Sequence, residues 1–374
     1  CIINYMGVSD VAQDADGVTV TVQNYAPITK NGESAKDGED AKASESVLDE
    51  PGETYQIRAK CVVNATGAWA NQFDKADGKD APNIRPARGS HIVIDSKKLP
   101  IDASFTVLHP RDNRPIFVYP WLGRTVIGTT DLDHPALGNA EVGMTQEELD
   151  YLLELTAWQF PDLQLKAQDV LASWAGVRPL VASGGLNSSG EKRDHSVWQN
   201  KRFISVSGGK LTTFRYIAKD VLEHAEDWLG EELSKSKRAQ YFAKEEIEKD
   251  STNTSSLSAA SSHSSQRLKG HYGPELSSML RNANQDTLGC VADTDILWQE
   301  LVWSAGHEAV VHLDDLMLRR CRLGLLLTEG GLQFEDQLKT LLQPIFGWND
   351  SQWQSEVERY RDIWHRYYWL PSHA

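Results

Sequence analysis

The sequence contains few cysteines and no long apolar run. Its cysteines are Cys1, Cys61, Cys290 and Cys321, and they form no C-x-x-C pair and no spacing typical of a metal site. Unpaired thiols are usual in reducing compartments, so we expect a cytoplasmic protein without a bound metal. No stretch approaches the roughly 20 apolar residues that a membrane-spanning helix needs.

The chain also has fewer basic than acidic residues. The chain has 38 Lys and Arg against 53 Asp and Glu, which gives a net charge of −15. This balance argues against a nucleic-acid partner, because nucleic-acid-binding surfaces are basic. At 374 residues the chain exceeds what one hydrophobic core usually serves, so more than one domain is expected.

Alternating residues predict two antiparallel pairs of strands. The first pair covers residues 18–22 and 55–59, separated by a polar segment over 30–52 that we expect to be disordered. The second pair covers 115–121 and 124–131, with a tight turn between its strands. Residues 147–160 have the apolar spacing of an amphipathic helix.

One stretch combines a strand, two glycines and the start of a helix. Phe203–Val206 reads as the strand, Gly208 and Gly209 follow it, and helical spacing begins near Ile217. Glycines let backbone N–H groups approach a ligand closely, and a helix N-terminus favours negative charge. The stretch therefore suits a phosphate or an anionic cofactor atom, and Lys210 adds a positive charge. The alternative is an ordinary strand–loop–helix joint with a surface lysine.

A second stretch also combines a strand, a glycine turn and the start of a helix. Residues 60–64 read as a buried parallel strand, and Ala-Thr66-Gly67 then forms a tight turn before a short helix. Ligands of open α/β sheets lie at the carboxyl ends of strands, which makes this turn a second candidate ligand site. A purely structural turn is the alternative.

Several polar residues interrupt apolar strands. Arg178 stands inside such a strand, where it is costly unless it meets a carboxylate or an anionic ligand. His91 stands at the start of another strand and has either a functional or a merely structural role. Arg193 beside Asp194 is either a further cation for a ligand or part of a surface salt bridge. Asp131, with neighbouring Asp133 and His134, lacks the further oxygen ligands of a calcium loop, so we reject a metal there.

The last third of the chain has a different composition. A charged and serine-rich linker is predicted over 231–265, and helices are predicted over 293–304, 308–327 and 352–368. The last of these carries aromatic residues at helical spacing. We expect them to pack onto their own domain rather than onto a membrane interface.

Taken in order, these motifs resemble the FAD-dependent sn-glycerol-3-phosphate dehydrogenases of the glycine/D-amino-acid oxidase-like flavoprotein superfamily. The segments that carry the resemblance are residues 64–69, 88–91, 127–131, 176–180, 193–194 and 208–212, together with 313–315 and 319–324 near the C-terminus. Several motifs in one order are far more specific than any one of them.

The resemblance implies an α/β (α+β) flavoprotein fold followed by an all-helical C-terminal domain. Its expected parts are a partial FAD-binding domain (1–83), a substrate-binding antiparallel sheet region (84–200), a return segment of the FAD-binding domain (201–230), the linker (231–265) and the helical domain (266–374). No G-x-G-x-x-G fingerprint follows a strand here. We therefore expect the first βαβ unit of the family to lie ahead of Cys1, and the FAD-binding domain to be incomplete.

The resemblance also implies an activity. The family oxidises the C2 hydroxyl of glycerol 3-phosphate to dihydroxyacetone phosphate, passes a hydride to FAD and then electrons to a quinone. It further suggests peripheral membrane contact and a homodimer. The implied residues are Arg178 and His91 for catalysis, Arg193, Lys210 and Arg178 for the substrate, and Thr66, Gly67, Gly208, Gly209, Lys210, Leu211 and Thr212 for FAD.

Three questions stay open at this stage. Either Arg178 or His91 would position or deprotonate the C2 hydroxyl; histidine is the more ordinary base, because an arginine is hard to deprotonate. A related FAD-dependent oxidase, acting on glycerol 3-phosphate with oxygen or on an amino acid, is an alternative function. A non-catalytic fragment that binds a phosphorylated ligand is another.

Overall fold

The computed structural model describes residues 1–25, 52–73, 76, 78, 81–135, 137, 141–182, 194–230 and 262–371. Arg193 lies outside these ranges, and so does nearly all of the loop predicted over 30–52 and the linker predicted over 231–265.

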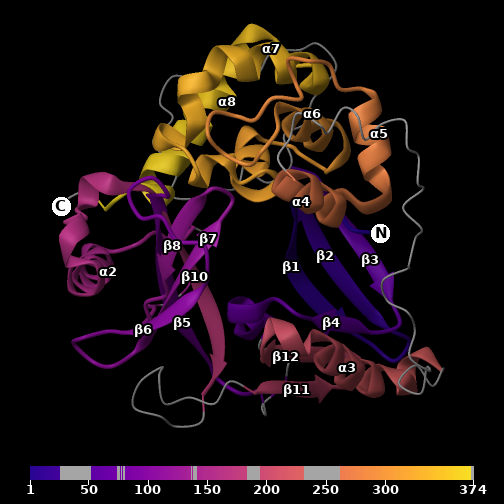
Figure 1. Cartoon of the computed structure of the whole chain (residues 1–374). Coiled ribbons are helices and arrows are strands. Elements are labelled where there is room, and N and C mark those ends of the chain that lie inside the picture. The colour runs from indigo at the N-terminus through magenta and orange to yellow at the C-terminus, as the bar shows by residue number, and fades with distance from the viewer. Residues whose placement is uncertain are drawn as a thin grey trace, which may run out of the picture. The chain divides into compact units, whose positions relative to one another are not determined.

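The described residues form two compact units (Figure 1). Unit 1 lies within Cys1–Gly89, Asp131–Val142 and Gly176–Ala239. Unit 2 lies within Ser90–Thr130, Gly143–Ala175 and Gln240–Ala374. The domain boundaries predicted from the sequence stay a prediction.

The first sheet of unit 1 is antiparallel. It consists of β1 (Met6–Gln13), β2 (Val18–Asn24) and β3 (Thr54–Ala59) in that order. Side chains alternate along a strand, so the three valines of β2 share one face, and all three are buried. The predicted pairing of the first two strands is confirmed, with Val20 opposite Ile57.

The second sheet of unit 1 holds the two glycine-ended strands. Its order is β11 (His195–Asn200), β12 (Phe203–Gly208) and β4 (Val62–Asn64), with β4 parallel to β12. Helix α3 (Phe214–Leu229) buries Val221 and Ala225 in a cluster with valine and isoleucine of β12. The predicted parallel strand is confirmed, but Val63 is 45% exposed rather than buried.

A six-stranded sheet completes the β structure. Its order is β10 (Val170–Val181), β5 (Ile84–Asp95), β8 (Arg124–Gly128), β7 (Pro115–Trp121) and β6 (Phe105–Leu108), and β9 (Leu132–Asp133) also pairs with β5. The division between the units falls inside β5 and β10. The second predicted strand pair is confirmed by β7 and β8, which a turn at Leu122 and Gly123 joins, both with positive φ.

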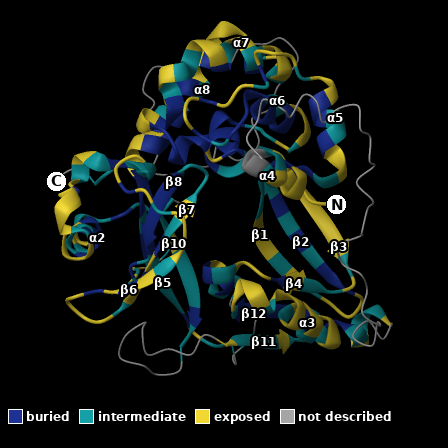
Figure 2. Ribbon diagram, in the orientation of Figure 1, coloured by how far each residue is buried: buried dark blue, intermediate teal, exposed yellow. Residues whose placement is uncertain are grey.

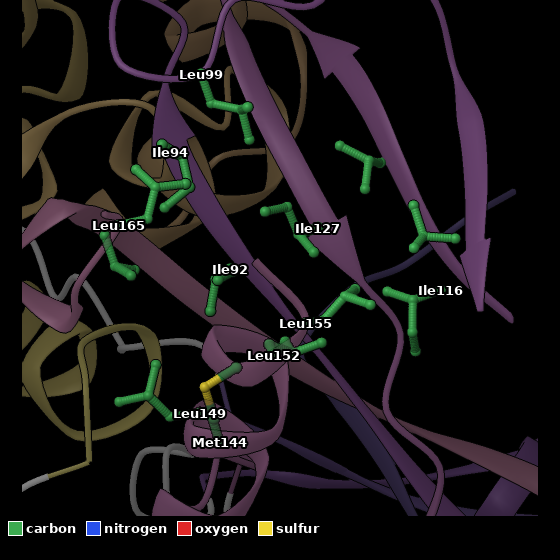
Figure 3. Packing of buried hydrophobic residues seen from close by; sticks show 13 residues of the cluster. Ile92, Ile94, Leu99, Ile116, Ile127, Met144, Leu149, Leu152, Leu155 and Leu165 are labelled. Atoms are coloured by element: carbon green, nitrogen blue, oxygen red, sulfur yellow. The ribbon is translucent and has the colours of Figure 1, made fainter. Parts of the chain in front are cut away.

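Helix α2 (Gln146–Gln159) confirms the helix predicted over 147–160 and supplies one side of a hydrophobic core of unit 2. Its leucines Leu149, Leu152 and Leu155 pack with Ile92 and Ile127 of the sheet (Figure 3). The helix begins with a capping box, in which the Glu148 carboxylate accepts hydrogen bonds from Thr145.

The C-terminal part of unit 2 is helical. Its longer helices are α4 (Ser262–Tyr272), α5 (Leu276–Arg281), α6 (Trp298–His307), α7 (Glu335–Phe346) and α8 (Asp350–Ile363). Within the described residues, the short helices are η1 (Gly67–Phe73), η2 (Pro161–Leu163), η3 (Ala167–Asp169), η5 (Leu211–Thr213), η7 (Gly273–Glu275), η8 (Asp315–Arg320), η9 (Leu323–Leu325), η10 (Thr328–Phe334) and η11 (Trp364–Tyr368).

The aromatic residues of the last helix face the interior. Trp353, Tyr360 and Trp364 are fully buried, and α8 shows buried residues along its inner side in Figure 2. The Tyr360 hydroxyl donates to the carbonyl of Gly330 (2.6 Å), and the Trp364 indole N–H donates to the carbonyl of Gly324 (2.8 Å). The prediction that this aromatic stripe packs onto its own domain is confirmed.

Two of the predicted helices differ from the structure. The helix expected over 293–304 begins only at Trp298. The continuous helix expected over 308–327 is wrong, because η8 and η9 are separate short turns. Arg322 between them has a φ of 58°, which a right-handed helix cannot contain. The predicted α/β (α+β) class with a helical C-terminal part is nevertheless confirmed. No helix in the described ranges has the length and apolar character needed to cross a membrane.

A buried arginine ties β8 to the helical part of unit 2. Arg124 is 3% exposed. Its Nε donates to the carbonyl of Leu326 (2.7 Å) and its Nη2 to the carboxylate of Asp293 (2.6 Å). Exposed Lys97 binds the same carboxylate. Hydrogen bonds from Lys97 and Arg124 lower the pKa of Asp293 to about 2.

Replacing Arg124 by methionine should lower the free energy of unfolding by about 2 kcal/mol, because the carbonyl of Leu326 and the carboxylate of Asp293 lose the donors that the buried guanidinium supplies. Lys97→Met is the matched control, and should cost less than about 1 kcal/mol because that pair is exposed and screened. Urea unfolding at neutral pH measures the free energy of unfolding of both variants. Equal losses of stability in the two variants would contradict the idea that the burial of Arg124 makes its contacts more stabilising than those of Lys97.

The depressed pKa of Asp293 also sets a pH dependence. Its contribution to stability is fully present above the unfolded pKa of about 4 and is lost as the pH falls towards the folded value of about 2. The difference in free energy of unfolding between the wild type and Arg124→Met should therefore decrease as the pH is lowered from about 4 to about 2.

Candidate functional site

The carboxyl ends of β4 and β12 lie side by side in unit 1. Their parallel register places Asn64 opposite Ser205, and the Asn64 amide donates to the Ser205 hydroxyl (3.1 Å) and to the carbonyl of Ala70 (3.0 Å). Near the end of β12, the Ser207 hydroxyl donates to the carbonyl of Gly67 (3.2 Å). The two glycine turns that the sequence singled out therefore meet at one edge of the sheet.

The turn after β12 requires both of its glycines. Gly208 and Gly209 have φ of 79° and 78°, where residues with a side chain are strained. A methyl group at Gly209 would also lie 2.7 Å from Ile217 Cδ1, and one at Gly208 would lie 2.6 Å from the carbonyl oxygen of Asp194. The turn thus packs tightly against α3 and the start of β11. The predicted helix is present and begins earlier than Ile217: the short helix η5 follows Lys210 and leads directly into α3 at Phe214.

The turn after β4 is open instead of packed. Gly67 has a φ of 64°, and a methyl group there would meet no atom within 4 Å. Asn64 fixes this turn, since its side-chain oxygen accepts hydrogen bonds from the backbone N–H (3.3 Å) and the hydroxyl (2.7 Å) of Thr66. Rigid backbone that faces open space is what the close approach of a ligand requires.

Large apolar side chains follow both turns and are exposed. Leu211 is 89% exposed and Tyr216 is 74% exposed, and Phe214 and Trp69 are also exposed. Together with Thr212, which is exposed as well, they lie beside glycine backbone at the strand ends. This combination fits a flat, largely apolar ring such as the isoalloxazine of FAD, so the residues predicted to bind FAD are compatible with it.

Two of the three predicted substrate cations belong to unit 1. Lys210 is exposed directly after the glycine pair. Arg178 lies on β10, three residues before Val181, whose Cγ2 would be 3.3 Å from a methyl group at Gly208. Arg178 and Lys210 thus come from segments that reach the same turn. Nothing can be added for Arg193, which lies outside the described residues.

His91 belongs to unit 2. It stands on β5 opposite Gly128 of β8, where a methyl group would lie 2.2 Å from the imidazole Cδ2. The imidazole stacks on the indole of Trp174, with ring centroids 4.8 Å apart, and Trp174 in turn contacts Trp121. The glycine makes room for the ring and the stack fixes its plane.

The structure adds residues that sequence reasoning missed. Asp131 pairs with Arg178 (3.3 Å), and Asp133 pairs with Arg85 (2.6 Å), so both carboxylates once weighed as metal ligands are paired with arginines. An arginine within an apolar strand indicates that a carboxylate lies nearby, but this signal does not identify Asp131, which is 47 positions away along the chain. For Trp174, the sequence gave no indication of a role other than its position just before the motif that contains Arg178.

One cysteine lies next to the candidate site. Cys61 directly precedes β4 and packs against the cluster formed by β12 and α3. Burial raises the pKa of its thiol, so Cys61 stays protonated at neutral pH and is a packing residue rather than a nucleophile.

Two known protein families match successive parts of this chain. Residues 8–223 match the family described as FAD dependent oxidoreductase, and residues 215–353 match the C-terminal domain of alpha-glycerophosphate oxidase. An aerobic glycerol-3-phosphate dehydrogenase from Staphylococcus saprophyticus is 27% identical over 321 residues, which are 80% of this chain and 57% of the relative. A Staphylococcus aureus protein of the same name is 25% identical over 327 residues, 82% and 58% of the two chains.

The chain thus spans less than two thirds of the length of these relatives. Among solved structures, the glycerol-3-phosphate dehydrogenase from Bacillus halodurans complexed with FAD has a TM-score of 0.69 at 24% identity. The similarity covers 96% of this chain and 69% of that one. It supports the predicted flavoprotein fold.

Proposed function

Because the chain belongs to the FAD dependent oxidoreductase family, we propose that it takes part in the oxidation of sn-glycerol 3-phosphate to dihydroxyacetone phosphate. The observation that carries the proposal is that β10, the strand of Arg178, ends beside Gly208 through Val181, and that Lys210 directly follows the same glycine pair. A carboxylate substrate needs one cation, whereas a phosphate dianion favours several. The names of the relatives and the C-terminal match support the same substrate.

We assign FAD to the face formed by the two turns. Gly67, Gly208 and Gly209 would let the ring approach the backbone, while Thr66, Leu211 and Thr212 would line it. Bound FAD would supply the acceptor for the hydride that leaves C2 of the substrate. Backbone N–H groups of the glycine pair, near the N-terminus of α3, are suited to stabilise negative charge that gathers at the ring edge.

We assign the substrate to the cations. Lys210 and Arg178, with Arg193 as a third candidate, would bind the phosphate and orient C2. His91 is the proposed proton acceptor for the C2 hydroxyl, and a perturbed Arg178 is the alternative. The stacking of His91 on Trp174 supports the first assignment, since a base has to be held in one orientation.

The electron acceptor, the location and the assembly belong to the same proposal. We propose a quinone acceptor, peripheral contact with the cytoplasmic face of a membrane and a homodimer. Oxygen is a second candidate acceptor, because residues 215–353 match a domain named after an oxidase. Reoxidation rates of the reduced flavin with a soluble quinone and with oxygen separate the two.

The direct test is anaerobic reduction of the bound flavin in the protein expressed from its complete reading frame. Glycerol 3-phosphate should bleach the visible flavin band, while glycerol without its phosphate should do so only weakly. Bleaching by N-methylglycine but not by glycerol 3-phosphate would overturn the proposal in favour of an amino-acid oxidase. A folded but colourless protein would favour the non-catalytic alternative.

A further inference from the structure

The ion pair between Arg178 and Asp131 has an asymmetric environment. The Arg178 Nη1 lies 3.3 Å from the Asp131 Oδ1, and both residues belong to unit 1. The Asp131 side chain is only 8% exposed, whereas that of Arg178 is 31% exposed. A carboxylate withdrawn from water needs a partner, so the arginine is held on one side while part of it still faces solvent.

The backbone around Asp131 is the rigid side of this pair. Asp131 directly precedes β9, which pairs with β5 through Leu132 opposite Arg88 and Asp133 opposite Ala87. The backbone N–H of His134 also donates to the carbonyl of Pro86 (3.0 Å). Arg178, by contrast, comes from β10 on the other side of β5 and has a long side chain with many rotamers. A fixed carboxylate therefore selects among the rotamers of a mobile guanidinium.

We infer that Asp131 is a positioning residue, which holds the guanidinium of Arg178 in the orientation that the anionic substrate requires. A guanidinium carries five N–H donors, so its pair with Asp131 is compatible with a second anion. The inference rests on the proposed function, because it gives Arg178 a place at the substrate. It gives a role to Asp131, which closes the segment 127–131 and is not among the implied site residues.

The neighbouring pair of Arg85 and Asp133 provides a matched control. It lies two residues further along the chain and also joins an arginine to a carboxylate of β9. Here Nε and Nη2 of Arg85 engage both carboxylate oxygens, at 2.9 and 2.6 Å, and the Asp133 side chain is 50% exposed. This is an ordinary surface pair with no part in the proposed chemistry.

The experiment compares Asp131→Asn, Asp131→Ala and Asp133→Ala in the flavin-loaded protein. In Asp131→Ala we expect kcat to fall about 10- to 100-fold while KM changes much less, because misorientation acts on the reacting geometry. Asp131→Asn keeps an oxygen acceptor and should fall between this variant and the wild type. Asp133→Ala should match the wild type.

A second readout does not depend on turnover. Phenylglyoxal modifies accessible guanidinium groups, and mass spectrometry of peptides follows each arginine separately. Arg178 should be modified several-fold faster in Asp131→Ala and at the wild-type rate in Asp133→Ala, whereas Arg85 should show the reverse pattern. Wild-type kcat together with unchanged modification of Arg178 in Asp131→Ala would overturn the positioning role alone. Absence of turnover in the wild type would overturn the proposed function, and a change in modification would then still report the ion pair.

Discussion

Arg178→Ala should lower kcat/KM for glycerol 3-phosphate by about 10²–10³-fold, the usual cost of removing one preorganised electrostatic group. We place Arg178 at the substrate, and it lies on β10, the strand whose Val181 packs beside Gly208. The loss should not extend to FAD content, because no residue assigned to the flavin is altered. Steady-state kinetics and the flavin absorbance of the purified variant measure the two effects separately.

Arg85→Ala is the control for this variant. Arg85 is an arginine of unit 1 that pairs with Asp133 on the surface, so kcat/KM should stay within about twofold of the wild type. If both arginine variants lose activity to the same degree, the loss reflects general damage to unit 1. If neither loses activity, Arg178 is not at the substrate.

Gly67→Ala should weaken FAD binding by about tenfold or more, equivalent to about 1.4 kcal/mol. The added methyl group would point into the open space beside the turn after β4, where no atom of the described chain lies within 4 Å. That space is where we place the ring. Binding of FAD followed by fluorescence quenching or calorimetry gives the dissociation constants.

Gly230→Ala controls for backbone strain. Gly230 ends α3 with a φ of 73°, close to the 64° of Gly67, and a methyl group there also meets nothing within 4 Å. Each variant should therefore lose about 1–2 kcal/mol of stability, the cost of a left-handed conformation. Only Gly67→Ala should lose FAD. Equal effects of the two variants on FAD affinity would reject the assignment of the turn.

Local patterns explain why much of the fold could be predicted from the sequence. Alternation of apolar and polar residues predicted β2, β3, β7 and β8. Alternate burial accounts for the pattern in β2 and β7, whereas β3 is mostly exposed and β8 is buried throughout. The single Gly67 and the pair Gly208–Gly209 at strand ends predicted the two turns of the candidate site, because few residues other than glycine adopt the positive φ values that these turns require.

Pairings between distant residues were beyond such patterns. No local signal links Arg178 to Asp131, or His91 to Trp174, since each pair joins segments that are distant in the sequence and meet only in the folded sheet around β5. The broken helix near Arg322 has a similar cause. Apolar spacing there reflects burial from several sides, and buried Asp314 holds Arg319 and Arg359 in ion pairs that a regular helix does not predict.

The most direct measurement is a structure of the FAD-loaded protein with bound glycerol 3-phosphate. We predict that the flavin ring contacts the backbone of Gly67, Gly208 and Gly209, and that the phosphate accepts hydrogen bonds from Arg178 and Lys210. A flavin bound away from these turns, or a phosphate that touches neither cation, would contradict the assignment.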